Sequence, residues 1–416
     1  MVNYDICIIG AGPAGCACAY VASKLGLKTL LVEKNNYLGG LMTGGLVIPV
    51  MKSDSELNNE FYFELIKYAK KYNAQIEYKD GNKGWFNPNL LKIVLDNMLK
   101  DVGVDIMFET YPRKVFYQDK NINYIEFESN MLSLPIYSKY YLDSTGDSKI
   151  FSLLNEKFFN ENSEKQPSSL RFIMSGVNIS ELENFLLEID SDRSVTDSYK
   201  TNDQIMLTTA CTWDNKKWNL KGIFDKAIKN NDLKPFDSAY FQLFSVPYAK
   251  GSIAFNCPRM VDFDQNNPIE HANALIEARN SIFRISNFMI KYFKGFENAY
   301  ISQIADLTGY RETNTILAKK QAIFDELTNK TDIEPILTSN YPIDIHSNKK
   351  NQSKLTQSEQ IFIGIESLIS KKYSNLYAAG RNLGADRLIH ASLRTQNSCM
   401  VMGEAVAKDV FKKLNN

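Results

Sequence analysis

The chain has 416 residues, of which 44% are hydrophobic and 23% charged, and its 48 basic residues balance its 48 acidic ones. Because a single hydrophobic core stops growing at roughly 250–300 residues, this length predicts two interleaved domains. A net charge of zero gives no general attraction to nucleic acid or to an anionic membrane, so we expect neither as a partner.

The sequence also argues against a membrane span and against a disulfide or metal framework. We find no run of the ~18 apolar residues that a span needs, and glycines and a proline interrupt the apolar N-terminus where a signal peptide would continue. None of the cysteines forms a C-x-x-C pair, so we expect a reducing cytoplasm and no metal site. The cysteines are Cys7, Cys16, Cys18, Cys211, Cys257 and Cys399.

The first hundred residues alternate between strand and helix patterns. The apolar run Tyr4–Ile9 predicts a buried parallel strand. Small apolar residues from Pro13 to Leu25, closed by Gly26, predict a helix with a C-terminal glycine. The elements expected next are a strand over Lys28–Glu33, helices over Asn58–Tyr72 and Asn89–Asp101 (the second opened by Pro88), and a strand over Val104–Phe108.

Four short runs then predict an antiparallel meander added to a parallel sheet. These runs are Arg113–Tyr117, Tyr124–Glu128, Met131–Tyr137 and Tyr140–Leu142. From Ile150 to about Lys294 strands mix with helices, which is typical of a second domain. The segments expected from there on are strands over Leu170–Ser175, Ile205–Thr209, Tyr240–Val246 and Ser252–Asn256, a helical stretch over Glu270–Ile290, a polar loop over Ser347–Ser353, a strand over Asn375–Ala379 and a long closing helix over Ser392–Lys412.

A glycine-rich turn between the first strand and the first helix carries the strongest chemical signal. Residues 10–15 read G-x-G-x-x-G. Gly10 allows the tight turn, Gly12 lets the backbone approach a pyrophosphate, and Gly15 lets helix and strand pack closely. The helix N-terminus then offers free N–H groups to the phosphates.

The residues after the second strand favour FAD over NAD. Glu33 stands where an acidic side chain accepts hydrogen bonds from ribose hydroxyls, and Lys34 follows it. The doublets Gly39–Gly40 and Gly44–Gly45 come just beyond. They indicate a backbone that passes close to a long extended ligand, which suits the pyrophosphate and ribityl arm of FAD.

Separated blocks along the chain resemble the glutathione-reductase-like FAD flavoproteins and, more narrowly, the FAD-dependent oxidoreductase family. The blocks are Glu33–Lys34 with Leu38–Gly45, Leu142–Asp147, Gly251–Arg259, Thr308–Thr313, Tyr341–His346, Leu376–Arg381 and Ser392–Arg394. The sequence departs from the family at Asp386–Arg387, where relatives often carry a small residue followed by histidine.

The resemblance implies an α/β fold with a Rossmann-like FAD-binding domain of parallel sheet and β-meander, plus an interleaved α+β substrate domain. We expect the FAD-binding domain at 1–150 and again at 346–416, with the substrate domain at 151–345. The residues expected to bind the cofactor are Gly10, Gly12, Pro13, Ala14, Gly15, Glu33, Lys34, Gly39, Gly40, Leu41, Thr43, Gly44, Gly146, Asp147, Gly380, Arg381 and Arg394.

Two arginines are candidates for holding an anion. Arg394 falls in the first turn of the expected closing helix, where a cation opposes the helix dipole, so we expect it to face the flavin or an anionic substrate, the alternative being solvent. Arg311 is either a clamp for a substrate carboxylate or one half of a structural pair with Glu312. Arg259 is expected to be structural.

The chain contains only three histidines. His346 and His390 lie in or beside family-like blocks, where an imidazole could take a proton as hydride leaves for the flavin or could attach the flavin covalently. His271 lies in a helical stretch and is expected at the surface or at a helix end.

These features favour a dehydrogenase or oxidase that passes hydride from a small substrate, which can be anionic, to N5 of FAD. We find neither a second G-x-G-x-x-G nor a C-x-x-C near the flavin, so the electron acceptor or donor is not specified, nor is the oligomeric state. The alternatives are a flavin-dependent reductase or monooxygenase that needs a separate reductant, and a non-catalytic FAD-binding subunit.

Overall fold

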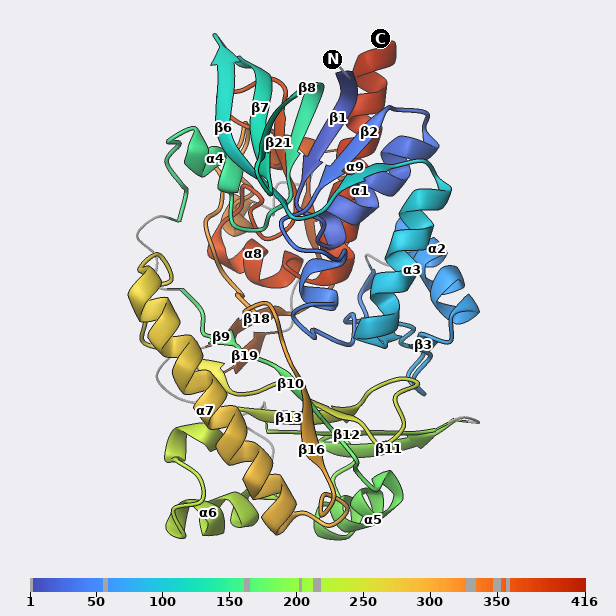
Figure 1. The fold of residues 1–416 in the computed structure, drawn as a ribbon, viewed down its shortest axis with the longest axis vertical. Helices are drawn as coiled ribbons and strands as arrows, with labels where there is room; N and C mark the ends of the chain where they lie inside the picture. Colours follow the sequence, from blue (N-terminus) through green and yellow to red (C-terminus); the bar gives the residue numbers. More distant parts are fainter. Residues whose placement is uncertain are drawn as a thin grey trace.

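Two large β-sheets follow one another along the long axis of the molecule, and both chain ends lie at the outer end of the first sheet (Figure 1). The computed structural model describes residues 3–54, 59–160, 165–201, 204–211, 218–326, 334–346, 353–356 and 360–416.

The first sheet joins the start of the chain to its end. Its strand order is β5-β2-β1-β8-β7-β6, and β21 pairs with β8. The pairs among β5, β2, β1, β8 and β21 are parallel, whereas β6, β7 and β8 form the antiparallel meander. The strands are β1 (Asn3–Ile9), β2 (Thr29–Val32), β5 (Asp105–Met107), β6 (Thr110–Gln118), β7 (Asn121–Ser129), β8 (Leu132–Asp143) and β21 (Leu376–Ala378).

Helices pack against this sheet because their small or apolar faces match it. Helix α1 begins with Pro13 in its first turn and is buried from Ala14 to Ala22. It packs closely against α9, and α2 and α3 lie beside the pair. The bounds are α1 (Pro13–Lys24), α2 (Glu60–Lys71), α3 (Pro88–Asp101), α4 (Lys149–Leu153), α8 (Arg387–Leu393) and α9 (Gln396–Asn415).

The second sheet is antiparallel, with strand order β11-β12-β13-β14-β10-β16. Helices α5 and α6 lie on its far side, and the long helix α7 runs along one edge of the molecule beside it (Figure 1). Its core is rich in aromatic residues, with Phe172 and Phe255 stacked at 4.4 Å between ring centroids. The elements are β10 (Phe172–Ser175), α5 (Ile179–Ile189), β11 (Thr196–Lys200), β12 (Ile205–Cys211), α6 (Lys221–Lys229), β13 (Phe241–Ser245), β14 (Ile253–Phe255), α7 (Pro268–Tyr292) and β16 (Tyr300–Ile304).

Short two-stranded pieces complete the fold. They are β3 (Gln75–Ile76) with β4 (Trp85–Phe86), β9 (Ser168–Ser169) with β15 (Arg259–Met260), β17 (Leu337–Ser339) with β20 (Ile361–Ile363), and β18 (Ile343–His346) with β19 (Ser353–Thr356). The 3₁₀ turns are η1 (Gly40–Met42), η3 (Pro235–Ser238), η4 (Phe324–Glu326) and η6 (Ile365–Ser367).

Two expected elements differ from the structure. The runs Met131–Tyr137 and Tyr140–Leu142 are one strand, β8, because Lys139 points to solvent and Ser138 bonds to backbone carbonyls without ending the strand. The closing helix is two helices: α8 ends at Leu393 and α9 starts at Gln396, since Thr395 adopts an extended conformation between them.

Two expected segments fall partly outside the described residues. These are Asn58 at the start of the second helix and positions 347–352 of the polar loop, after which Ser353 begins β19. The predicted fold class is confirmed: a parallel Rossmann-like core with a meander joins an antiparallel α+β part. The boundaries at 150 and 345 stay a prediction.

The contact between α1 and α9 depends on a glycine, Gly403, because this residue has no side chain. A Cβ on Gly403 of α9 would lie 2.0 Å from the carbonyl oxygen of Ala14. We therefore expect Gly403→Ala to lower the free energy of unfolding by about 1–3 kcal/mol in denaturant titrations. The control is Gly222→Ala in α6, where a Cβ meets nothing within 4 Å. The same change there should be neutral or stabilise by less than about 1 kcal/mol. Equal effects would contradict this account.

Candidate active site

The glycine-rich turn has the geometry of a dinucleotide cradle. Gly10 has a φ of +100°, and a Cβ there would lie 2.7 Å from the backbone of Ser144. A Cβ on Gly15 would lie 1.9 Å from the carbonyl oxygen of Gly10. Gly12, in contrast, has nothing within 4 Å of its Cβ position and lines a cavity. Gly10 and Gly15 allow close packing, whereas Gly12 leaves the backbone open to a ligand.

Glu33 stands at the end of β2 beside this turn and is buried. Its Oε2 accepts a hydrogen bond of 2.7 Å from the amide of Ala11. Its Oε1 accepts from the backbone amide of Asn35 at 2.9 Å and from Nδ2 of Asn35 at 2.6 Å. Because a carboxylate has about four lone-pair sites, one site remains for a ribose hydroxyl. Glu33 and Lys34 both line the cavity.

Some residues of the segment after β2 line the cavity, and others hold the segment in place. Gly40 and Leu41 line the cavity. Gly39, Thr43 and Gly44 do not line the cavity; they hold the segment in place. Gly39 donates 2.8 Å to the carbonyl of Ala11, the hydroxyl of Thr43 donates 2.6 Å to that of Leu38, and Gly44 accepts from the amides of Asp306 and Leu307.

The cavity has a volume of about 640 Å³, within the usual range of ligand sites. Its walls also include segments beside the second sheet: Ser169–Arg171 just before β10, helix α7, and Ala305–Arg311 just after β16. Basic residues outnumber acidic ones in these walls. The basic residues are Lys34, Lys149, Arg171, Arg279, Arg311, Arg381 and Arg394, and the acidic ones are Glu33, Asp147 and Asp306.

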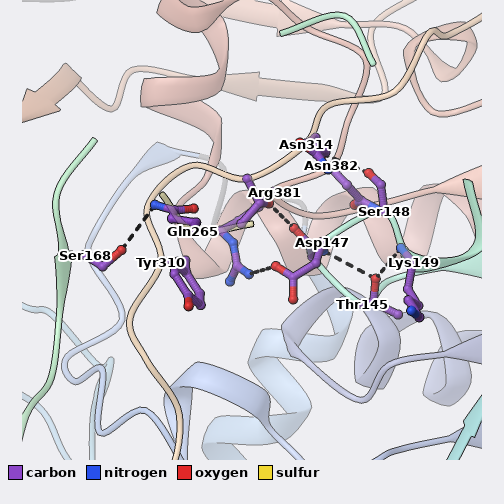
Figure 2. A network of polar contacts seen from close by, with 12 residues as sticks. Thr145, Asp147, Ser148, Lys149, Ser168, Gln265, Tyr310, Asn314, Arg381 and Asn382 are labelled. Atoms are coloured by element: carbon purple, nitrogen blue, oxygen red, sulfur yellow. Dashed lines mark hydrogen bonds and ion pairs between the residues drawn. The ribbon is translucent and has the colours of Figure 1, made fainter. Parts of the chain in front are cut away.

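An ion pair joins the turn after β8 to the turn after β21 (Figure 2). Nη2 of Arg381 lies 3.1 Å from Oδ1 of Asp147. Gly146, with a φ of +75°, makes room for this guanidinium, because a Cβ there would lie 2.7 Å from Nη2. A second, smaller cavity of about 430 Å³ shares Asp147 and Tyr310 with the first in its walls.

Three buried or largely buried arginines, Arg171, Arg311 and Arg394, line one part of the cavity; we call them the arginine cluster. Arg171 donates to the carbonyls of Leu46 and Ile48 at 3.2 and 3.3 Å. Burial lowers the pKa of Arg171 to about 10, and the nearby charge of Arg311 acts in the same direction.

Asp344 is the carboxylate closest to the arginine cluster among the partners described. Arg311 donates 2.6 Å to the carbonyl of Pro167, while Arg394 donates 2.8 Å to Oδ2 of Asp344. Burial raises the pKa of Asp344, but the hydrogen bond from His346 and the charge of Arg394 outweigh it, so the pKa lies well below its usual value. One carboxylate thus faces several guanidinium groups.

Arg394 therefore corrects one expectation. It does not stand in the first turn of the closing helix but caps the C-terminus of α8, where a cation is favourable. The alternative expected for Arg311, a structural pair with Glu312, is not what the structure shows for Glu312. Glu312 pairs with Arg387 at 3.2 Å and accepts from the amide of Gln166 at 2.8 Å. The departure from the family pattern is thus structural here, since Asp386 caps α8 through the amide of Ile389.

His346 and His390 are buried, and neither lines the cavity. Nδ1 of His346 accepts 2.9 Å from Arg259, and Nε2 lies 3.1 Å from Asp344. Nε2 of His390 lies 2.8 Å from the carbonyl of Arg381. Burial lowers the pKa of each to about 3, helped by Arg311 and Arg394 respectively. Their catalytic role stays a prediction.

His271, expected at the surface or at a helix end, stands near the N-terminal end of its helix and lines the cavity. It lies on α7, and its Nε2 is 2.6 Å from the hydroxyl of Tyr310. Burial lowers the pKa of His271, and burial raises the pKa of Tyr310 to about 12. Near neutral pH the pair is therefore an uncharged imidazole with an uncharged phenol.

Sequence reasoning missed Arg171, Tyr310 and His271. Arg171 offered a signal, because it interrupts the apolar run from Leu170 to Ser175. Tyr310 stands next to Arg311 in a family-like block. For His271 the sequence showed a helix but not which of its faces meets the other sheet.

The residues present fit FAD: an open cradle at Gly12, a carboxylate with spare acceptor capacity at Glu33, and a buried Nε of Arg381 that has no hydrogen-bond partner among the described residues. The profile of the protein family described as FAD dependent oxidoreductase matches residues 5–408. The chain belongs to this family. FAD is therefore its cofactor.

Solved structures share the fold of this family member at low identity. The p-nitrophenol 4-monooxygenase PnpA of Pseudomonas putida DLL-E4 superposes with a TM-score of 0.51 and 9% identity, over 100% of this chain and 81% of the monooxygenase. A triple mutant of a flavin-dependent brominase gives a TM-score of 0.50 and 12% identity, over 99% of this chain and 81% of the brominase. At these identities the likeness is one of fold alone.

Curated relatives match only in short segments. The mitochondrial dihydrolipoyl dehydrogenase of Schizosaccharomyces pombe is 41% identical over 69 residues, which are 17% of this chain and 13% of that protein. A digeranylgeranylglycerophospholipid reductase of Picrophilus torridus is 58% identical over 38 residues, 9% of this chain and 10% of the reductase. The narrower glutathione-reductase-like placement rests on such short matches and stays a prediction. Among the described residues, no helix is long and apolar enough to cross a membrane.

The open position of Gly12 gives a test of the cradle. We expect Gly12→Asp to abolish FAD binding, because a carboxylate would enter the space meant for phosphate, while the fold survives because a Cβ meets no atom. FAD content and the far-ultraviolet circular dichroism spectrum measure the two effects. Gly222→Asp in α6 is the matched control and should retain FAD. A yellow Gly12→Asp protein would contradict the assignment.

Proposed function

We propose that this family member dehydrogenates a small anionic substrate by transfer of hydride to N5 of FAD. The observation that carries the proposal is the arginine cluster, which lines the same cavity as the glycine-rich turn. The ion pair described for the cluster is that of Arg394 with Asp344, and three buried guanidinium groups that share one carboxylate are costly unless a ligand supplies further negative charge. A carboxylate on the substrate would meet this need, and guanidinium groups bind carboxylates in a bidentate manner.

We assign cofactor binding to three parts of the cavity wall. The backbone of the glycine-rich turn would hold the pyrophosphate, with Pro13 and Ala14 opening α1. Glu33 would accept from a ribose hydroxyl. Gly40, Leu41, Gly146, Asp147, Gly380 and Arg381 would line the remaining length.

When bound, FAD supplies a hydride acceptor at N5. A substrate with an H–C–O–H or H–C–N–H group gives up the hydride and one proton and becomes C=O or C=N. The proton needs an acceptor on the protein. The neutral imidazole of His271 lines the cavity and bonds Tyr310, so we propose this pair in place of His346 or His390. The electrons then leave to O₂ or to another acceptor.

The alternative function is that of a reductase or monooxygenase. Under that alternative, a reductant such as NAD(P)H would bleach the FAD absorbance without substrate. The experiment mixes the FAD-loaded protein anaerobically with a panel of 2-hydroxy acids and amino acids, with their uncharged amides, and with NAD(P)H. The proposal expects bleaching by a carboxylate and not by its amide. Bleaching by NAD(P)H alone favours this alternative, and no bleaching by any compound favours a non-catalytic subunit.

The arginine cluster gives a charge-specific prediction. We expect Arg311→Lys to raise KM at least about tenfold for the carboxylate substrate, since one bidentate hydrogen bond is lost, with little change in kcat. The control is Arg259→Lys, because Arg259 is also buried but does not line the cavity. Steady-state kinetics against an uncharged analogue completes the comparison. Equal effects on charged and uncharged substrates would remove Arg311 as the clamp.

The rate of FAD bleaching and its pH dependence distinguish His271 from His390 as the general base. We expect His271→Asn to slow FAD bleaching about 10²-fold while FAD stays bound, because a general base is lost. Burial lowers the pKa of His271, so the native rate should fall only as the pH drops below the ordinary histidine range of about 6.5. His390→Asn is the matched control and should leave the rate unchanged. If His390→Asn alone slows bleaching, the base is His390.

A further inference from the structure

Helix α7 presents a row of large apolar side chains to solvent. Ile269, Ile276, Phe283 and Ile290 are 72%, 55%, 62% and 37% exposed. They recur every seven residues, which is two helical turns less about 20°, so they lie on one line about 10.5 Å apart. A helix covered by water alone normally carries polar residues on such a line. The row therefore indicates a contact surface.

A second exposed row runs beside it and carries no charge. Asn273, Asn280 and Asn287 also recur every seven residues, and each is exposed. Amide side chains both donate and accept hydrogen bonds, so asparagines on facing helices can pair. We call the two rows together the α7 face.

No element among the described residues covers the α7 face. Helix α7 lies along the outer edge of the molecule (Figure 1). Its opposite side is buried through Ile282, Ile285 and Met289, and His271 and Leu275 line the cavity. The face thus points away from the body of the protein.

We propose that the α7 face binds the α7 face of a second copy of this chain in an antiparallel dimer. A two-fold axis beside Asn280 places Ile269 opposite Ile290 of the other copy and Ile276 opposite Phe283. The two rows are self-complementary about points half a residue apart: the apolar pairs centre between residues 279 and 280, while Asn280 meets its own copy and Asn273 meets Asn287. Such self-complementarity is what an isologous interface requires.

Ion pairs within the chain neutralise most of the charge along α7. Glu277 pairs with Arg284 and with Lys234, both at 2.9 Å, and Lys291 pairs with Asp232 at 2.8 Å. A second copy therefore meets little excess charge of the same sign. Antiparallel pairing opposes the two helix dipoles, whereas parallel pairing would align them.

The area sets the strength of the dimer. A helix of 25 residues is about 37 Å long and about 10 Å wide, so two such faces bury roughly 740 Å², less than the roughly 1,200 Å² of a stable interface. The turn η3 extends the face, because Asp237 bonds Ser281 and Arg284 of α7 while Phe236 is 43% exposed. We therefore expect dissociation in the micromolar range.

Sedimentation velocity of the FAD-loaded protein between about 1 and 100 µM tests the dimer. We expect Ile276→Glu or Phe283→Lys alone to weaken dimerisation at least tenfold. The double variant should recover it, because the new carboxylate of each copy faces the new ammonium of the other. Leu132→Glu, at a 65% exposed residue of the first sheet, should have no effect. A native protein that is monomeric throughout, or single variants that dimerise normally, would overturn the proposal.

Cysteine cross-linking tests the orientation. Asn280→Cys should form a disulfide with its own copy under mild oxidation, since its partner lies beside the axis. Ile269→Cys should not, because the two positions are about 31 Å apart in an antiparallel pair. The native cysteines Cys7, Cys16, Cys18, Cys257 and Cys399 are buried. Cross-linking at 269 in place of 280 would mean parallel pairing and overturn the assignment.

Discussion

The fold depends on close packing of backbone against backbone where α1 meets its neighbours. Gly15 brings α1 against the turn after β1, and Gly403 brings α9 against the start of α1. Any side chain at these points would push the helices apart. Because α1 is fixed on both sides, its N-terminus and the open position at Gly12 lie at a defined place at the carboxyl end of β1, an inner strand of the first sheet. The rest of the cavity is arranged around that place.

Charge is distributed unevenly in a protein that is neutral overall. Its basic and acidic residues balance in number, yet the cavity gathers Arg171, Arg311 and Arg394 in a buried setting. Burial lowers the pKa of Arg171 and of Arg311, and Asp344 is the carboxylate that faces this cluster. Composition alone excluded broad anion binding but said nothing about this local excess.

The sequence predicted what depends on local pattern. The strand, glycine-rich turn and helix over residues 3–24 follow from apolar runs and from glycine positions, and the family follows from ordered blocks. The break before α9 was missed because Thr395 is neither glycine nor proline. The place of His271 in the cavity was missed because helical periodicity identifies an inward face, but only the tertiary structure shows that this face meets the cavity lined by the glycine-rich turn. Roles assigned to single side chains therefore needed the fold.

The pairing of α1 with α9 also bears on how the chain matures during synthesis. The ribosome makes α9 about 370 residues after α1, which takes roughly 20 to 80 s at ordinary rates. During that time the small apolar side chains from Ala14 to Ala22 lack their final partner. The glycine-rich turn is translated first, whereas the turn after β21 and the start of α9, which line the same cavity, are translated near the end. Premature termination upstream of α9 would leave this hydrophobic surface open to chaperones and proteases.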